Sequence, residues 1–167
     1  MTSLATYGPA IAATTERLRS VIADADPATI VTTRHPRAAR TGVTGTSANL
    51  FLYQDQLTRY RDGADPTGGE RVVGAELRYL VSVYPADEVE VDAASHRAFG
   101  AARAALESSP VVTVSLASGA TLSAQLSSSS LTLSDLTSLW LASGTPLRLS
   151  FGIAVRISLP VSRGPAT

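Results

Sequence analysis

The hydrophobic residues of this chain recur at two spacings, one typical of helices and the other typical of strands. Residues 9–23 and 92–107 carry apolar or small residues every three to four positions, which predicts two amphipathic helices. A shorter helix is predicted after Thr132, because Thr132-Leu-Ser-Asp135 resembles a capping box. Gly144 and Pro146 would end that helix. The inward face of the first helix is expected to be formed by Ile11, Thr15, Leu18 and Ile22.

The other apolar segments are rich in β-branched residues or alternate with polar ones, and both patterns indicate strands. Residues 111–116 and 121–126 are expected to pair as a hairpin with Gly119 in the turn. The last segment alternates from Leu147 to Leu159, which predicts a long half-buried strand. The expected strands therefore cover residues 29–34, 47–53, 76–84, 111–116, 121–126 and 147–159.

Polar and turn-forming segments separate these elements. We expect loops at residues 35–45 and 62–69, and a polar connector at residues 127–130. Residues 54–60 either continue the preceding strand or turn out to solvent. The final strand can lie at a sheet edge, where it would contact other subunits, or centrally, where it would only build the core; its alternation is consistent with both.

The order of helices and strands predicts an α+β fold in a single domain. Strands dominate without strict alternation with helices, which favours a mostly antiparallel sheet with two longer helices and one short helix packed on one face. The domain is expected to span residues 1–160, with residues 161–167 as a flexible C-terminal tail. The length of 167 residues is typical of one domain.

Composition excludes several classes of function. The chain has no cysteine, so disulfides, thiolate catalysis and cysteine-ligated metals are excluded. All fourteen of its basic residues are arginine, balanced by fourteen acidic residues, so no net charge favours nucleic acid or an anionic membrane. No apolar run is long enough to span a membrane, and the N-terminal segment does not resemble a secretory signal. We therefore expect a cytoplasmic protein.

Motifs for catalysis, cofactor binding and metal binding are absent from the sequence, so we expect no enzyme, no cofactor and no metal. His35 and His96 are far apart and have no partner at ligand spacing. An acidic stretch precedes the second helix. It is either a carboxylate site for acid–base chemistry or, as we favour, a set of charges suited to a helix N-terminus. Its members are Asp87, Glu88, Glu90 and Asp92.

Arginines gather in two loops and are the candidates for protein contact. They either form a solvated surface or bind an acidic protein surface, because arginine suits desolvated interfaces better than lysine. These residues are Arg34, Arg37, Arg40, Arg59 and Arg61. A second set is expected to form structural core, with Trp140 as its anchor on the short helix. That set is Leu136, Leu139, Trp140 and Phe151.

Four segments resemble, in order, the cap proteins of contractile injection systems. The most specific are Ser134-Asp-Leu-Thr-Ser-Leu-Trp140 and Gly144-Thr-Pro-Leu-Arg-Leu-Ser150, which are similar to the C-terminal signature of that family. The N-terminal helix before Pro27 is similar to the opening of the family, and Asn49-Leu-Phe-Leu-Tyr53 resembles one of its strands. Residues 76–84, followed by His96-Arg97 at the opening of a helix, resemble another strand and the helix after it. The resemblance extends over most of the chain.

The resemblance implies a structural role similar to that of phage tail terminators. Such proteins form a six-fold ring on the end of the inner tube and sheath, stop polymerisation and hold the sheath end. The implied partners are other copies of the chain and the sheath and inner-tube subunits, without nucleic acid or direct membrane insertion. The implied location is the cytoplasm, within a phage-tail-like particle that can be released. Two alternatives stay open: a monomeric protein-binding adaptor that uses edge-strand addition, and a small-molecule-binding domain or enzyme.

Overall fold

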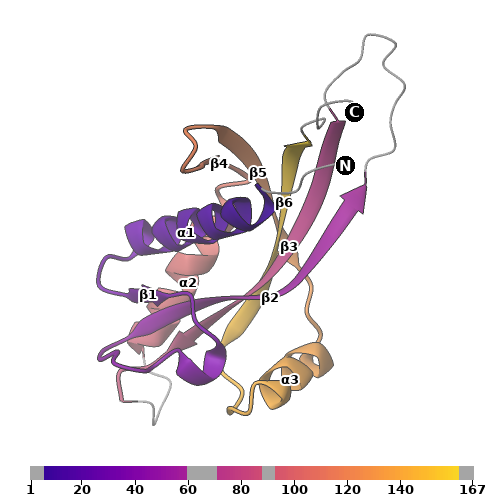
Figure 1. Ribbon diagram of the computed structural model, residues 1–167. Helices are drawn as coiled ribbons and strands as arrows, with labels where there is room; N and C mark the ends of the chain where they lie inside the picture. Colours follow the sequence, from indigo (N-terminus) through magenta and orange to yellow (C-terminus); the bar gives the residue numbers. More distant parts are fainter. Residues whose placement is uncertain (1–5, 60–70, 88–92, 162–167) are drawn as a thin grey trace.

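A six-stranded sheet with helices on both faces forms the fold (Figure 1), as a computed structural model shows. The structure describes residues 6–59, 71–87 and 93–161. The predicted loop at 62–69 and the predicted tail, apart from residue 161, lie outside these residues. The helices are α1 (Tyr7–Ala25), the 3₁₀ turn η1 (Pro36–Ala38), α2 (Ala93–Glu107) and α3 (Leu133–Ala142), and the strands are β1 (Ile30–Thr32), β2 (Ser47–Arg59), β3 (Arg71–Tyr84), β4 (Val111–Ser115), β5 (Thr121–Ser129) and β6 (Ser150–Val161).

The strand order in the sheet is β1-β2-β3-β6-β5-β4. Only β1 and β2 pair in parallel, and every other pair is antiparallel, so the predicted fold class is confirmed. The final strand lies between β3 and β5. The expectation that it could form a sheet edge is therefore wrong, and its alternation reflects a central strand that builds the core. Its small residues Gly152 and Ala154 are buried on the face opposite the alternating apolar residues.

Several strands begin or end away from the predicted positions, because pairing with a neighbour decides where a strand ends. β2 continues to Arg59 against β3, which begins at Arg71. The residues expected to form a polar connector are wrongly predicted, because Ser127, Ser128 and Ser129 pair with β6 as part of β5. β6 begins at Ser150, three residues later than predicted.

The main hydrophobic core lies between the sheet and the helices α1 and α2. Alternate residues of β3 point into it, and Leu77, Tyr79 and Val81 are completely buried there. The inward face of α1 is Ala10, Thr14, Leu18 and Ile22. The predicted face was displaced by one residue at its start, since Ile11 and Thr15 are only half-buried.

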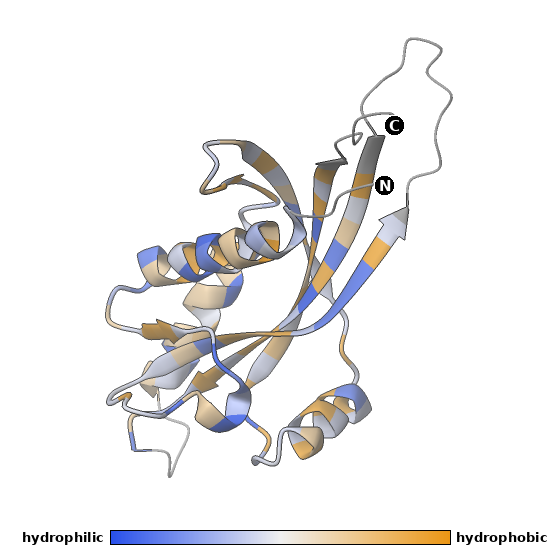
Figure 2. Cartoon of the chain, in the orientation of Figure 1, coloured by the Kyte–Doolittle hydropathy of each residue, from blue (hydrophilic) through white to orange (hydrophobic). Residues whose placement is uncertain are grey.

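A second, smaller core lies on the opposite face of the sheet, under α3 (Figure 1). The expectation that all helices pack on one face is therefore wrong. The second face of β3 also presents large apolar side chains, Leu80 and Tyr84, which the short helix covers. The approach is close at Gly152, where an added Cβ would lie 2.9 Å from Cδ1 of Leu131 and 2.9 Å from the Ser129 carbonyl oxygen. Figure 2 shows apolar residues along the strands and also in α3, which covers this second face.

Two side-chain hydrogen bonds fix α1 against the sheet. The Tyr7 hydroxyl donates to Oδ2 of Asp55 on β2 at 2.6 Å, and burial together with this carboxylate raises the pKa of Tyr7. The hydroxyls of Thr15 and Tyr79 lie 2.9 Å apart. Burial raises the pKa of Tyr79 to about 12, so both phenols stay neutral at physiological pH. These bonds orient the helix that covers the main core.

Candidate assembly surfaces

The loop between β1 and β2 is fixed by two of the arginines that the sequence suggests as protein contacts. The guanidinium of Arg40 donates to the Gly45 carbonyl oxygen at 2.6 Å and to the Ala86 carbonyl oxygen at 2.9 Å. The guanidinium of Arg34 donates to the Thr41 carbonyl oxygen. Arg34 and Arg40 therefore hold the loop together and tie it to the segment after β3.

A buried asparagine fixes the start of the same loop. The side-chain oxygen of Asn49 on β2 accepts hydrogen bonds from Oγ1 of Thr32 at 2.8 Å and from the backbone N–H of Arg34 at 2.9 Å. Its amide group donates to the Arg34 carbonyl oxygen at 2.9 Å. Because Asn49 is fully buried, these bonds satisfy polar groups that would otherwise be costly to bury. The residue lies within the NLFLY motif, but the motif alone did not indicate this role.

Arg37 is the candidate arginine whose charge is left available on this loop. It is the exposed residue of the 3₁₀ turn, and its guanidinium has no hydrogen bond or ion pair within residues 6–59, 71–87 and 93–161. The turn itself is ordered by His35, whose Nδ1 accepts from the Arg37 N–H at 3.3 Å and whose ring meets Phe51 edge-on at 5.3 Å. Arg59 ends β2, but its side chain and the whole of Arg61 lie outside the described residues.

The predicted core residues are divided between the two faces of the sheet. Trp140 of α3 is buried against the sheet, and Leu136 and Leu139 of the same helix are half-buried beside it. Phe151 lies on the other face, where its ring meets Phe99 of α2 edge-on at 5.3 Å. The sequence identified apolar anchors but not that they belong to two different cores.

Two leucines near the ends of α3 are exposed among polar residues of the helix, a feature that the sequence pattern does not reveal. Leu133 and Leu141 are 71% and 79% exposed, and Leu147 after the helix is 50% exposed. A groove of about 660 Å³ runs between this helix and the sheet; it is lined by Tyr53, Gln54, Arg78, Ser129, Ser130, Leu131, Asp135, Ser138, Leu139 and Ala142. Single exposed leucines of this kind are common on protein surfaces, so they do not by themselves mark a contact surface.

The capping box at the start of α3 is confirmed. Oγ1 of Thr132 accepts from the Asp135 N–H at 3.1 Å, and Oδ2 of Asp135 accepts from the Thr132 N–H at 2.9 Å. The hydroxyl of Thr132 also donates to that carboxylate at 2.7 Å. These hydrogen bonds hold the pKa of Asp135 below its usual value.

We expect Thr132→Ala to lower the free energy of unfolding by about 1 kcal/mol, because it removes the N-cap hydroxyl. The lowered pKa of Asp135 means that its contribution is present above the unfolded-state pKa and is lost as pH falls through the folded-state pKa. Urea denaturation between pH 6 and pH 3 measures both effects. The gap between wild type and Thr132→Ala should narrow on acidification, and a gap that widens would contradict the capping account.

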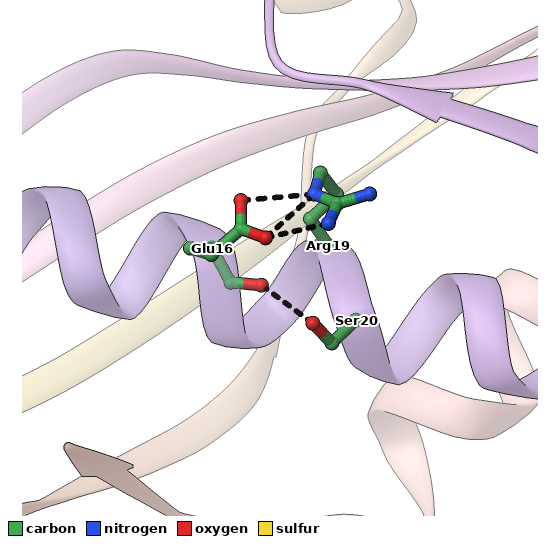
Figure 3. Close-up of polar contacts among 3 residues, drawn as sticks. All are labelled: Glu16, Arg19 and Ser20. Atoms are coloured by element: carbon green, nitrogen blue, oxygen red, sulfur yellow. Dashed lines mark hydrogen bonds and ion pairs between the residues drawn. The ribbon is translucent and has the colours of Figure 1, made fainter.

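Several other charges on the described surface pair within the chain. On α1, Glu16 accepts from Arg19 through both carboxylate oxygens, and Oγ of Ser20 donates to the Glu16 carbonyl oxygen (Figure 3). On the sheet, Glu76 accepts from Arg156 at 3.0 Å and from Arg78 at 2.9 Å. Both bonds lower the pKa of Glu76, and the bond from Arg156 has the larger effect. Such pairs reduce the net field of the surface, whereas the exposed arginines Arg17, Arg37 and Arg97 have no ion pair among the described residues.

The described residues contain no cluster of metal-ligating side chains. His35 is engaged with Phe51 and His96 lies exposed on α2, so the structure does not bring the two histidines to one site. Of the acidic stretch only Asp87 is described; Glu88, Glu90 and Asp92 lie outside the described ranges. None of the helices in the described part of the chain is both long and apolar enough to cross a membrane.

The fold is shared with solved proteins from contractile injection systems. One is the sheath/tube terminator of the PVC extracellular contractile injection system in its extended state, with a TM-score of 0.62 and 18% identity over 95% of this chain and 58% of that one. Another is the tube-terminating cap of the anti-feeding prophage, with a TM-score of 0.62 and 17% identity over 91% of this chain and 56% of that one. The present chain thus spans little more than half the length of either protein.

The sequence itself matches a family model. Residues 11–167 match the Pvc16 N-terminal domain, and the chain belongs to that family. A comparison with curated proteins found no match. The resemblance to cap proteins that the motifs indicated is therefore confirmed at the level of family and fold.

Proposed function

We propose that this chain is a structural assembly domain that ends the inner tube and sheath of a contractile injection system. The observation that carries the proposal is the family match over residues 11–167, together with a fold like that of two terminator or cap proteins. Within a particle the domain would form a hexameric cap, stop further addition of subunits and anchor the sheath end. It would assemble in the cytoplasm as part of a phage-tail-like particle that is later released.

The role proposed is mechanical and not enzymatic. A terminator has to bind the growing end through one surface. It must not offer another surface to which the next subunit could bind. Both demands concern packing and hydrogen bonding between chains, and neither needs a nucleophile, a cofactor or a metal. The net charge of the chain is zero, and the exposed Arg37 on the loop after β1 suits contacts of this kind.

The mass of the assembled species tests the ring. Six chains of 17.3 kDa give about 104 kDa, which light scattering separates easily from the monomer. We expect this mass either for the purified chain or for the chain released from isolated tube ends. A monomer in both samples would contradict the ring and favour an adaptor that binds partners by edge-strand addition.

We expect Arg37→Ser to weaken binding to tube and sheath subunits by about three- to tenfold at low salt, with the effect shrinking as salt rises. The reason is that an exposed, unpaired guanidinium contributes to association mainly through screened electrostatics. Co-sedimentation with purified tube and sheath at two salt concentrations measures the change.

Arg17→Ser is the matched control, since it removes the same charge from an exposed position on α1. Arg34 and Arg40 are not suitable for this test, because each holds the loop through backbone carbonyls and its loss would disturb folding. Equal binding by Arg37→Ser and wild type at low salt would show that this loop does not face the particle.

A further inference from the structure

The two terminal strands of the sheet carry no charged side chain. Residues 108–134 and residues 27–33 contain no acidic or basic side chain. In the fold the first stretch forms β4 with its hairpin partner, and the second contains β1. These are the two terminal strands in the order β1-β2-β3-β6-β5-β4. Soluble proteins usually protect open edges with charges, so two uncharged edges indicate strands that become covered.

Every second peptide group of β4 faces away from its partner strand β5. The N–H of Leu116 donates to the Ala120 carbonyl oxygen, and the N–H of Leu126 donates to the Pro110 carbonyl oxygen, both at 2.8 Å. The register between β4 and β5 is regular, so hydrogen-bonding direction alternates between these two points. The peptide groups of Val111, Thr113 and Ser115 therefore point away from the sheet.

The opposite edge is formed by β1. The N–H of Ile30 donates to the Thr46 carbonyl oxygen at 3.3 Å, so Ile30 and Thr32 face β2 and the peptide groups of Val31 point outward. By contrast, β2 beyond its pairing with β1 carries Gln54 and Asp55, which are exposed polar residues that protect an edge.

The two uncharged edges complement each other. Ile30 is 45% exposed and Val111 is 58% exposed. Their strand neighbours Val31 and Val112 pack into the main core, so Ile30 and Val111 both lie on the sheet face opposite α1 and α2. Because β1 and β2 are parallel and the four strand pairs that follow across the sheet are antiparallel, β1 and β4 run in the same direction. A second copy can thus place its β1 beside β4, parallel to it, with the two β-branched side chains in contact on one face.

We infer that copies of this chain join head to tail, with β4 of one copy paired to β1 of the next. The contact uses two different surfaces, so each copy keeps one edge for each neighbour and the series can close into a ring. This inference rests on the proposed function for the ring itself and adds which strands form it. It also explains the lack of charge at both edges, because an unpaired charge in such a contact would be desolvated.

The absence of native cysteine makes the contact directly testable. Side chains on adjacent strands are close enough for a disulfide to form between them. The double variant Ile30→Cys/Val111→Cys, mildly oxidised, should give a ladder of covalent oligomers on a non-reducing gel. Each single variant should remain monomeric, and so should the control pair Ile30→Cys/Leu141→Cys. The experiment is done on the concentrated chain and on particles that carry the variants.

Each other outcome would overturn the inference that β4 pairs with β1. The outcomes also differ in what they say about the proposed cap function. A covalent dimer from Val111→Cys alone would indicate a symmetric contact between two β4 strands. A product of Val111→Cys with a sheath subunit would assign β4 to the sheath. Rings of about 104 kDa without a ladder would support the proposed hexameric cap but show that β1 and β4 do not form its contacts. Monomers both in the concentrated chain and in the particles would contradict the ring and the strand contact alike.

A second variant provides an independent readout. Val111→Lys should abolish ring formation with an unchanged melting temperature, whereas Leu141→Lys should leave ring formation intact.

Discussion

Trp140→Ala should lower the free energy of unfolding by about 3–5 kcal/mol, as large truncations in a packed core do. The side chain is 1% exposed and packs with Ala39, Leu80 and Tyr84. Its ring lies 6.4 Å from that of Tyr84, and its indole N–H donates to Oγ of Ser150 at 3.2 Å. The truncation removes these contacts and leaves a cavity between α3 and the sheet. It also leaves the Ser150 hydroxyl without its donor.

Urea denaturation followed by far-ultraviolet circular dichroism measures this effect without relying on tryptophan fluorescence. Leu141→Ala is the matched control, since this neighbouring residue on α3 is 79% exposed and its loss should change stability by less than about 0.5 kcal/mol. An unchanged midpoint for Trp140→Ala would mean that the second core does not stabilise the domain. The position of α3 on this face of the sheet would then need another explanation.

Local signals in the sequence predicted the elements well. Gly119 occupies the hairpin turn with a φ of 83°, a conformation that favours glycine, so the flanking strands were correctly paired. The Thr132 capping box marked the start of α3 to the residue. In both cases the information lies within a few residues of the structure that it determines.

The arrangement of those elements was harder to predict, because it depends on distant partners. Alternation from Leu147 to Leu159 shows that one face is buried, but not which strands lie on either side. The apolar side of α3 shows that Trp140 is buried, but not which face of the sheet buries it. Small residues such as Gly152 indicate which face of the sheet is covered, since they permit close packing on the second face.

The candidate contact residues show the same limit. Clustering of arginines predicts a contact surface on the loop after β1, but Arg34 and Arg40 donate to backbone carbonyls whose positions depend on the folded loop. Only Arg37 keeps the role of a contact candidate there. The exposure of Leu133 and Leu141 is not evident from the sequence, because leucines on the inner side of α3 give the whole helix an apolar pattern.

Removal of the gene should have the largest effect of all, because termination at a tail end is all or none. A growing tube or sheath presents surfaces that accept the next subunit, and the proposed cap covers them without offering another copy. Without it, we expect no particles, or tails of uncontrolled length with ragged sheath ends, while tube and sheath subunits are still made. Complementation with wild type should restore a single length.

The most direct test of this account is the distribution of tail lengths measured by electron microscopy in the deletion strain. A matched strain complemented with Leu141→Ala controls for the handling of the particles. The account predicts absent tails or a broad distribution in the deletion strain and a narrow one in the complemented strain. Stable particles of normal, uniform length in the deletion strain would contradict the proposal that this chain terminates the tail.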